Sequence, residues 1–158
     1  MVQATQEKET YESRNYFLKA RESIKRGNHS GAREYLEKAV KIAPDNPFYL
    51  SYLGLCTAVE GDVVKGKSLC AEAVRSLSTE PILYVNLGRV LLKDNRKDEA
   101  RRMFLKGYSM DRSNAPAALE LSSMGIRRKP VIPFLPRQNP LNVFLGKLRH
   151  KIGNRGNI

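Results

Sequence analysis

The segment that decides the fold is residues 47–80, PFYLSYLGLCTAVEGDVVKGKSLCAEAVRSLSTE, because its pattern returns on both sides of it in the same register. The small residue Gly54 is matched by Ala20 and Gly88. Three further positions return in this register, in the sets Ala32, Gly66 and Ala100; Leu36, Cys70 and Phe104; and Ala39, Ala73 and Gly107. A fixed period of about 34 residues, with small and large residues in register, is typical of stacked helical hairpins.

The helix-ending residues follow the same period. Gly27, Gly61 and Asn95 are one period apart and belong to the types that tolerate the left-handed conformation at a helix C-terminus. Pro47 and Pro81 have the same spacing, and proline is favoured in the first turn of a helix. Each unit is therefore predicted to be two helices, with a turn between them and a proline opening the next pair.

These positions resemble the tetratricopeptide repeat family. The family pattern of a large residue, Leu-Gly, Ala, Phe, Ala and Pro is approximated three times, over residues 13–46, 47–80 and 81–114. The residues that carry the resemblance are Tyr16, Ala20, Ala32, Leu36, Ala39 and Pro44; then Leu50, Leu53, Gly54, Gly66, Cys70 and Ala73; then Tyr84, Leu87, Gly88, Ala100, Phe104 and Gly107. The resemblance implies an all-α, right-handed superhelical solenoid of antiparallel helix pairs that holds other proteins together.

The resemblance also implies a concave groove lined by the first helix of each pair. The positions that correspond to this lining are Arg14, Phe17, Arg21, Ile24, Phe48, Ser51, Leu55, Ala58, Ile82, Val85, Arg89 and Leu92. They form an apolar strip with arginines at both ends, and exposed strips of this kind mark interaction sites. The arginines favour an acidic partner segment, since a guanidinium binds a carboxylate in a bidentate manner.

One subset of the family grips the C-terminal carboxylate of chaperones with lysine and asparagine at fixed offsets. The corresponding positions here are Phe17, Arg21, Tyr52, Ile82 and Asn86. Only Arg21 and Asn86 have suitable chemistry, and the paired lysine–asparagine arrangement is absent. The sequence therefore does not favour a binder of chaperone tails.

Composition bounds the rest of the chain. Its 158 residues suffice for one domain and an appendage: residues 1–12 as a polar extension of the first helix, residues 13–125 as the repeats with a closing helix, and residues 126–158 as a tail. In the closing helix, Ala117, Ala118 and Leu121 are expected to cover the last hairpin, with Glu120 facing outward. The start of the chain is polar and no stretch is long enough to span a membrane, so a cytoplasmic protein with reduced, buried Cys56 and Cys70 is expected.

The tail is the most basic part of the chain. Residues 126–158 hold eight Lys or Arg and no Asp or Glu, which leaves 12 − 8 = +4 for residues 1–125 out of a formal net charge of +12. The segment from Pro130 to Pro136 holds three prolines and four apolar residues, which favours an extended conformation. Residues 140–152 follow with Leu141, Phe144, Leu145, Leu148 and Ile152 on one face, as expected of an amphipathic helix.

Three interpretations of this tail remain open. It packs on the end of the solenoid, or it docks on a partner protein, or its basic helix contacts anionic lipid or nucleic acid. Nucleic acid is the weakest of these because no nucleic-acid motif accompanies the charge. The residues expected to make the contact are Arg127, Arg128, Lys129, Phe134, Leu141, Phe144, Leu145, Lys147, Leu148 and Lys151. Residues 131–136 also have the character of a groove ligand, either for this chain or for a second copy.

The sequence offers no pattern typical of catalysis. The two histidines, His29 and His150, have no Cys, Asp or Glu at metal-ligand spacing, and neither a phosphate-binding loop nor a nucleophile elbow is present. No cofactor is expected. The sequence thus predicts a non-enzymatic adaptor or assembly scaffold whose groove binds a protein or peptide segment, with a peripheral membrane adaptor as the alternative.

Overall fold

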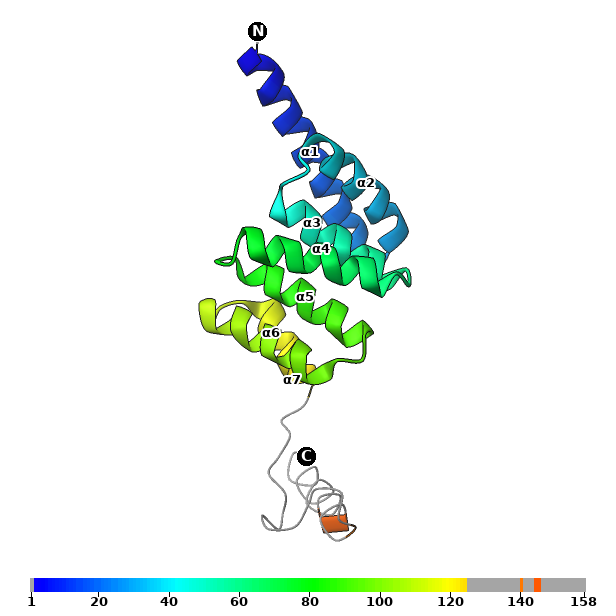
Figure 1. Cartoon of the computed structure of the whole chain (residues 1–158), viewed down its shortest axis with the longest axis vertical. Helices are drawn as coiled ribbons and strands as arrows, with labels where there is room; N and C mark the ends of the chain where they lie inside the picture. Colours follow the sequence, from blue (N-terminus) through cyan, green and yellow to red (C-terminus); the bar gives the residue numbers. More distant parts are fainter. Residues whose placement is uncertain (1, 125–139, 141–143, 146–158) are drawn as a thin grey trace, which may run out of the picture. The chain divides into compact units, whose positions relative to one another are not determined.

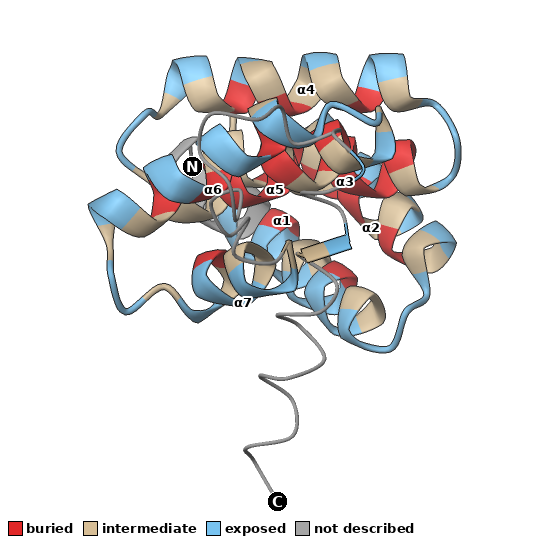
Figure 2. Cartoon of the chain, turned by 90° about the horizontal axis from the view of Figure 1, so that it is seen from below, coloured by how far each residue is buried: buried red, intermediate tan, exposed pale blue. Residues whose placement is uncertain are grey.

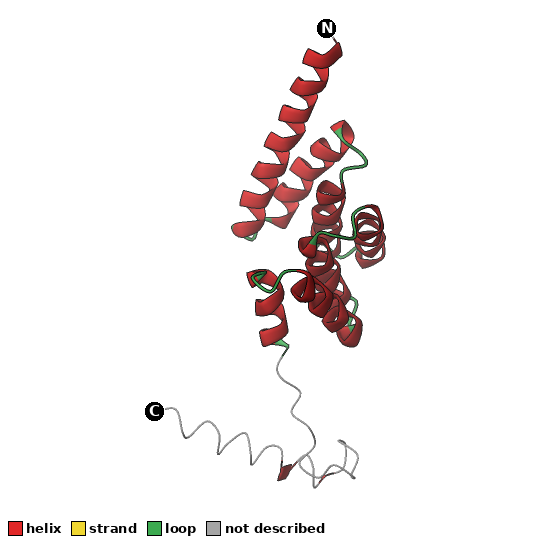
Figure 3. Cartoon of the chain, turned by 90° about the vertical axis from the view of Figure 1, so that its left-hand side faces the viewer, coloured by secondary structure: helices red, strands yellow, loops and turns green. Residues whose placement is uncertain are grey.

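The computed structural model describes residues 2–124, 140 and 144–145, with side chains from residue 10 onward. The chain divides into two units, Met1–Met124 and Gly125–Ile158. In the first unit the helices are α1 (Val2–Lys25), α2 (His29–Ile42), α3 (Pro47–Val59), α4 (Val63–Ser76), α5 (Pro81–Lys93), α6 (Lys97–Met110) and α7 (Ala115–Ser123). The described part of the chain contains no strand (Figure 3), so the predicted all-α class is confirmed.

The helices form three antiparallel hairpins that stack in chain order, and α7 closes the stack by packing on α5 and α6 (Figure 1). Each hairpin joins one helix pair, α1 with α2, α3 with α4 and α5 with α6. Burial is most continuous in α3 and α5, the first helices of the second and third hairpins (Figure 2). These two helices have neighbours on both sides, which is why their sequences are apolar over nearly their whole length.

The turns have the conformations that the sequence predicted. The backbone φ angle is 77° at Gly27, 114° at Gly61 and 57° at Asn95, which places all three residues in the left-handed region. Pro47 and Pro81 open α3 and α5 as expected. The starts of the second helices are less regular. The side chains of Asn28 and Asp62 cap α2 and α4. Arg96 stands in the same register before α6, but its side chain makes no capping hydrogen bond.

The two helices of the middle hairpin touch through their backbones at a pair of glycines. A Cβ added to Gly54 would lie 2.6 Å from the carbonyl oxygen of Gly66 and 2.7 Å from the sulfur of Cys70. A Cβ added to Gly66 would meet the carbonyl oxygen of Gly54 at 2.5 Å in return. The register of small residues in the sequence therefore marks the point where α3 and α4 cross without intervening side chains.

Ion pairs between successive hairpins follow the period of the repeat as well. Arg33 of α2 pairs with Glu60 at the end of α3, and Lys67 of α4 pairs with Asp94 at the end of α5, where the Lys67 Nζ lies 2.5 Å from a carboxylate oxygen. Arg33 and Lys67 are one repeat period apart, and so are Glu60 and Asp94. Both pairs join the second helix of one hairpin to the first helix of the next, and so they help to set the stacking angle.

Two expectations about α7 need correction. Ala118 is exposed, whereas Ala117 is fully buried and Leu121 packs beside it. Glu120 faces inward, where its carboxylate accepts a hydrogen bond from Arg89. The reason is that α7 packs on both α5 and α6, which turns the Ala117–Glu120–Leu121 side of the helix toward the stack.

Most expectations about the tail lie outside the described residues. These are the extended segment 130–136 and the contact residues Arg127, Arg128, Lys129, Phe134, Leu141, Lys147, Leu148 and Lys151. Of the expected helix 140–152, the structure describes Pro140, Phe144 and Leu145, which are helical, and Phe144 is 63% exposed.

Replacement of Gly54 by alanine should destabilise the unit. The added methyl group has no room against Gly66 and Cys70, and such overpacking costs about 1–3 kcal/mol, more than the gain of about 1 kcal/mol in helix propensity. Urea unfolding followed by circular dichroism would measure the difference. Ser68→Ala, at an exposed position of α4, is the control and should leave the free energy of unfolding within about 0.5 kcal/mol of the wild type. A Gly54→Ala protein as stable as the control would contradict the close approach.

The Lys67–Asp94 pair should be visible in the titration of the carboxyl group. The hydrogen bond and charge of Lys67 hold the pKa of Asp94 below its ordinary value, with Arg96 as a smaller contributor. A lowered folded-state pKa contributes stability that is present above the unfolded-state pKa and is lost as the pH falls through the folded-state pKa. Carboxyl-carbon NMR should therefore give Asp94 a pKa below that of a free aspartate, and Lys67→Met should raise it toward that value. The same pKa in both proteins would refute this ion pair.

Candidate functional site

The residues expected to line the groove lie on α1, α3 and α5, and they differ in exposure. Arg14 and Arg21 are exposed on α1. The partly buried members are Phe17, Ile24, Phe48, Ile82, Arg89 and Leu92. The buried members are Ser51, Leu55, Ala58 and Val85. The exposed and partly buried members are available to a partner, and of the buried members Leu55 keeps some exposed surface in the pocket described below.

Ser51 and Val85 have no exposed surface and are left out of the candidate site. The reason is a buried contact between α3 and α5, in which the side-chain amide of Asn86 donates a hydrogen bond to the hydroxyl of Ser51 at 3.1 Å. Val85 lies in the hydrophobic cluster that α7 completes with Ala117. Asn86 is completely buried as well, so its amide is not accessible to a partner carboxylate.

Aromatic side chains fill the space between α1 and α3. The ring of Phe17 lies 5.0 Å from that of Tyr49 and 5.2 Å from that of Tyr52, between centroids. The guanidinium of Arg21 lies over Phe17, with its carbon 5.9 Å from the ring centroid. Aromatic rings thus lie beside a cation between α1 and α3, whereas the contact between α3 and α5 combines the Asn86–Ser51 hydrogen bond with apolar residues such as Leu55 and Val90.

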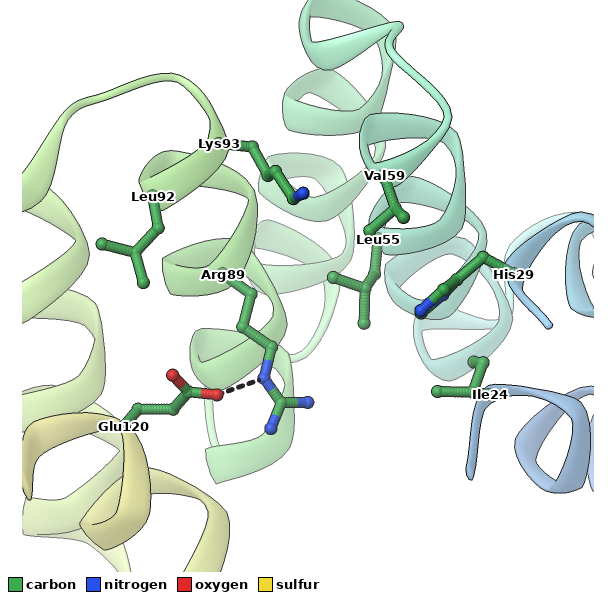
Figure 4. A pocket seen from close by; sticks show the side chains of 8 residues that line it. All are labelled: Ile24, His29, Leu55, Val59, Arg89, Leu92, Lys93 and Glu120. Atoms are coloured by element: carbon green, nitrogen blue, oxygen red, sulfur yellow. Dashed lines mark hydrogen bonds and ion pairs between the residues drawn. The ribbon is translucent and has the colours of Figure 1, made fainter. Parts of the chain in front are cut away.

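A pocket of about 460 Å³ is lined by residues of five helices, α1, α2, α3, α5 and α7. Its walls are largely apolar, its charged groups lie on α5 and α7, and the imidazole of His29 lies among the lining side chains (Figure 4). The lining residues are Ile24 of α1, His29 of α2, Leu55 and Val59 of α3, Arg89, Leu92 and Lys93 of α5, and Glu120 of α7. The pocket is a concave, largely apolar site with a few convergent polar groups, which is the usual composition of a binding site.

The electrostatic balance of this side is positive. The Nε of Arg89 donates to the carboxylate of Glu120 at 2.6 Å, in a pair whose side chains are 32% and 19% exposed. Among the side chains that the structure describes, Arg14, Arg21 and Lys93 form no ion pair with an acidic residue. Arg14, Arg21 and Lys93 are therefore available to a partner, whereas Arg89 is paired with Glu120 of α7.

The sequence identified four of the pocket residues, Ile24, Leu55, Arg89 and Leu92. It missed His29, Val59, Lys93 and Glu120. For two of these a signal was present, because Val59 and Lys93 stand one repeat period apart, each directly after an expected lining position, Ala58 or Leu92. In α3 the neighbouring Val59, rather than Ala58, reaches the pocket. No spacing in the sequence points to Glu120, whose position depends on the packing of α7.

The described residues show little that would support chemistry. No group of three or more His, Cys, Asp or Glu residues that could hold a metal ion occurs among them. Burial raises the pKa of both the Cys56 and the Cys70 thiol to about 12, so neither is a ready nucleophile at neutral pH. In the part of the chain that the structure describes, no helix combines the length and apolar character needed to cross a membrane.

Two solved structures illustrate the likeness of the fold. The first tetratricopeptide repeat domain of human RPAP3 is 18% identical, with a TM-score of 0.62 over 72% of this chain and 90% of that one. An O-GlcNAc transferase mutant of Thermobaculum terrenum is 21% identical, with a TM-score of 0.66 over 73% of this chain and 22% of that one. At these identities the likeness concerns the fold.

Sequence comparisons agree with the fold. The tetratricopeptide repeat profile matches residues 13–46 and 82–114. Two TPR repeat-containing proteins of Methanocaldococcus jannaschii, MJ0940 and MJ1428, are 30% identical over 105 residues and 28% identical over 91 residues. These matches take in 66% and 58% of this chain but only 33% and 16% of the relatives. Together with the three hairpins, in which α3 and α4 supply the repeat between the two matched segments, they establish that the chain belongs to the tetratricopeptide repeat family.

Proposed function

We propose that the repeat unit is a non-enzymatic interaction module that binds an extended segment of a partner protein in its groove. The observation that carries the proposal is the pocket lined by α1, α2, α3, α5 and α7, with largely apolar walls and unpaired cations nearby. A partner segment with apolar and acidic side chains matches this surface in both polarity and charge.

Related structures support a peptide as the ligand. One similar structure is the first repeat domain of Spaghetti (RPAP3) bound to the HSP90 peptide SRMEEVD, and another is the second repeat domain of human RPAP3 in complex with the HSP70 peptide SGPTIEEVD. Both peptides are acidic. In the present chain, however, the positions of the chaperone-type carboxylate grip include Phe17, Tyr52 and Ile82, and Asn86 is buried. The proposed partner is therefore an acidic segment other than a chaperone tail.

We also propose a role for each part of the chain. Residues 13–125 form the binding part, residues 1–12 extend the first helix, and the tail 126–158 is a second contact element whose basic residues suit an acidic surface. Recognition is assigned to the groove because all the pocket residues on which the proposal rests belong to residues 10–124.

A random peptide library displayed on phage, selected against the full chain, would test the function. We expect the selected peptides to combine acidic and apolar residues. Arg14→Glu/Arg21→Glu should weaken their binding by about tenfold, since each partly exposed ion pair contributes up to about 1 kcal/mol. High salt should also weaken binding, because exposed charges are screened.

A control with the same change in net charge separates the groove from charge alone. Arg101→Glu/Arg102→Glu reverses two exposed residues of α6, outside the pocket and outside the predicted groove positions. This variant should bind the selected peptides as the wild type does. Equal losses in both double variants, or selected peptides without acidic residues, would refute the groove as the recognition site.

A further inference from the structure

The pocket contains a carboxylate that the protein supplies itself. Glu120 reaches from α7 to Arg89 of α5, and its oxygen lies 2.6 Å from the Arg89 Nε (Figure 4). The carboxylate is therefore held at the edge of a cavity whose walls include Ile24, Leu55 and Leu92. The arrangement is a carboxylate paired with an arginine beside a largely apolar pocket.

The pocket has more positive than negative charge. Arg89 and Lys93 both line it, and Glu120 is the sole acidic residue among its lining. Lys93 is exposed and forms no ion pair with a described acidic side chain. One carboxylate thus faces two cations, so a second carboxylate is electrostatically favoured at this position.

The helix that carries Glu120 is held by few contacts. α7 has nine residues, and Ala117 is the one among them that is completely buried. Leu121 is partly buried against the cluster of α5 and α6, whereas Leu119 is 66% exposed. Because partly exposed ion pairs contribute little to stability, Glu120 can leave Arg89 without disrupting the hairpins below it.

We propose that Glu120 is an internal placeholder for an acidic side chain of the partner. The partner's Asp or Glu replaces Glu120 on Arg89 and also contacts Lys93, and a neighbouring aliphatic side chain enters the space between Ile24, Leu55 and Leu92. This inference rests on the proposed function and names the feature that the groove recognises: a carboxylate directly beside an aliphatic residue. The protein's own Leu119-Glu120-Leu121 has the same chemistry.

The charges of this chain argue for a partner rather than the tail as the occupant. Residues 126–158 hold eight basic residues and no Asp or Glu side chain. A tail of this composition offers no side-chain carboxylate to Arg89, and its cations would be repelled by Arg89 and Lys93. An acidic segment of another protein meets both requirements.

The test uses two peptides whose sequences differ at one residue. The probe is acetyl-Gly-Ser-Leu-Glu-Leu-Ser-Gly-amide, and its neutral counterpart carries glutamine in place of glutamate. Each is titrated into the 15N-labelled full chain and followed by amide chemical shifts. Glu120→Gln should bind the glutamate peptide about three- to tenfold more tightly than the wild type, the effect expected from freeing one partly buried arginine. The glutamine peptide should bind both proteins equally, and Arg89→Gln should reduce the preference for the glutamate peptide, with Lys93 left as the remaining cation.

A matched variant controls for the loss of an acidic residue elsewhere. Glu99 of α6 accepts a hydrogen bond from Arg96 at 2.6 Å, the same distance as in the Glu120–Arg89 pair, but it lies outside the pocket. Glu99→Gln should leave the affinity for both peptides unchanged. Phe134→Ala in the full chain should also leave it unchanged, and a gain in affinity there would mean that the tail occupies the pocket and would overturn the inference.

Three results would refute the placeholder role: no gain in Glu120→Gln, an equal gain for the glutamine peptide, or shifts that avoid Ile24, Leu55, Leu92 and Lys93. Hydrogen exchange checks that α7 stays folded in Glu120→Gln. If the backbone amides of α7 exchange faster in that variant, the Glu120→Asp variant provides the same comparison, with the charge retained on a shorter side chain. It should give a smaller gain in the same direction, and no gain would refute the role.

Failure of this inference can be told apart from failure of the proposed function. Peptides selected from the library that bind the groove, and lose affinity in Arg14→Glu/Arg21→Glu, would support the function even if Glu120→Gln changes nothing. In that case only the role of Glu120 would fall. If neither the selected peptides nor the glutamate peptide depends on any groove residue, both proposals fail.

Discussion

The close approach of helix backbones within a hairpin is the constraint on which the rest of this structure depends. At Gly54 and Gly66 the two helices leave no room for a Cβ atom, and in the third hairpin a Cβ on Gly88 would collide with the ring of Phe104. In the first hairpin the alanines Ala20 and Ala32 stand at the corresponding positions and are fully buried. Stacking of the hairpins places residues of their first helices, α1, α3 and α5, around one pocket.

Polar contacts adjust how successive hairpins meet. The pairs Arg33–Glu60 and Lys67–Asp94 repeat with the period of the sequence, and each joins the second helix of one hairpin to the end of the first helix of the next. One period further on, the corresponding residues are Arg101 and Arg128. Because both are basic, the sequence does not continue this ion pairing beyond the third hairpin. Inside, the hydrogen bond between Asn86 and Ser51 joins α3 to α5, whereas three aromatic rings separate α1 from α3. The contacts between successive first helices are therefore aromatic between α1 and α3, and polar and aliphatic between α3 and α5.

The helix that ends the stack also changes the character of the groove. α7 covers Val85 through Ala117 and brings Glu120 onto Arg89. A helix that serves to cover an apolar end thus supplies one wall of the pocket and neutralises one of its cations. The proposed acidic partner rests on the remaining positive charge of Arg14, Arg21 and Lys93 and on the aliphatic walls of the pocket.

The sequence by itself determined the helical hairpins, their boundaries and the repeat family, because glycines, prolines and small residues in a fixed register are local requirements of each hairpin. It also identified Arg14, Phe17, Arg21, Ile24 and Arg89 as candidates for the groove. Only the tertiary structure decided that Ser51 and Val85 are buried, that Val59 rather than Ala58 reaches the pocket, and that Glu120 faces inward. The physical reason is that these outcomes depend on contacts between hairpins and with α7, where side-chain size and helix packing angle, rather than the repeat, set which side of a helix meets a neighbour.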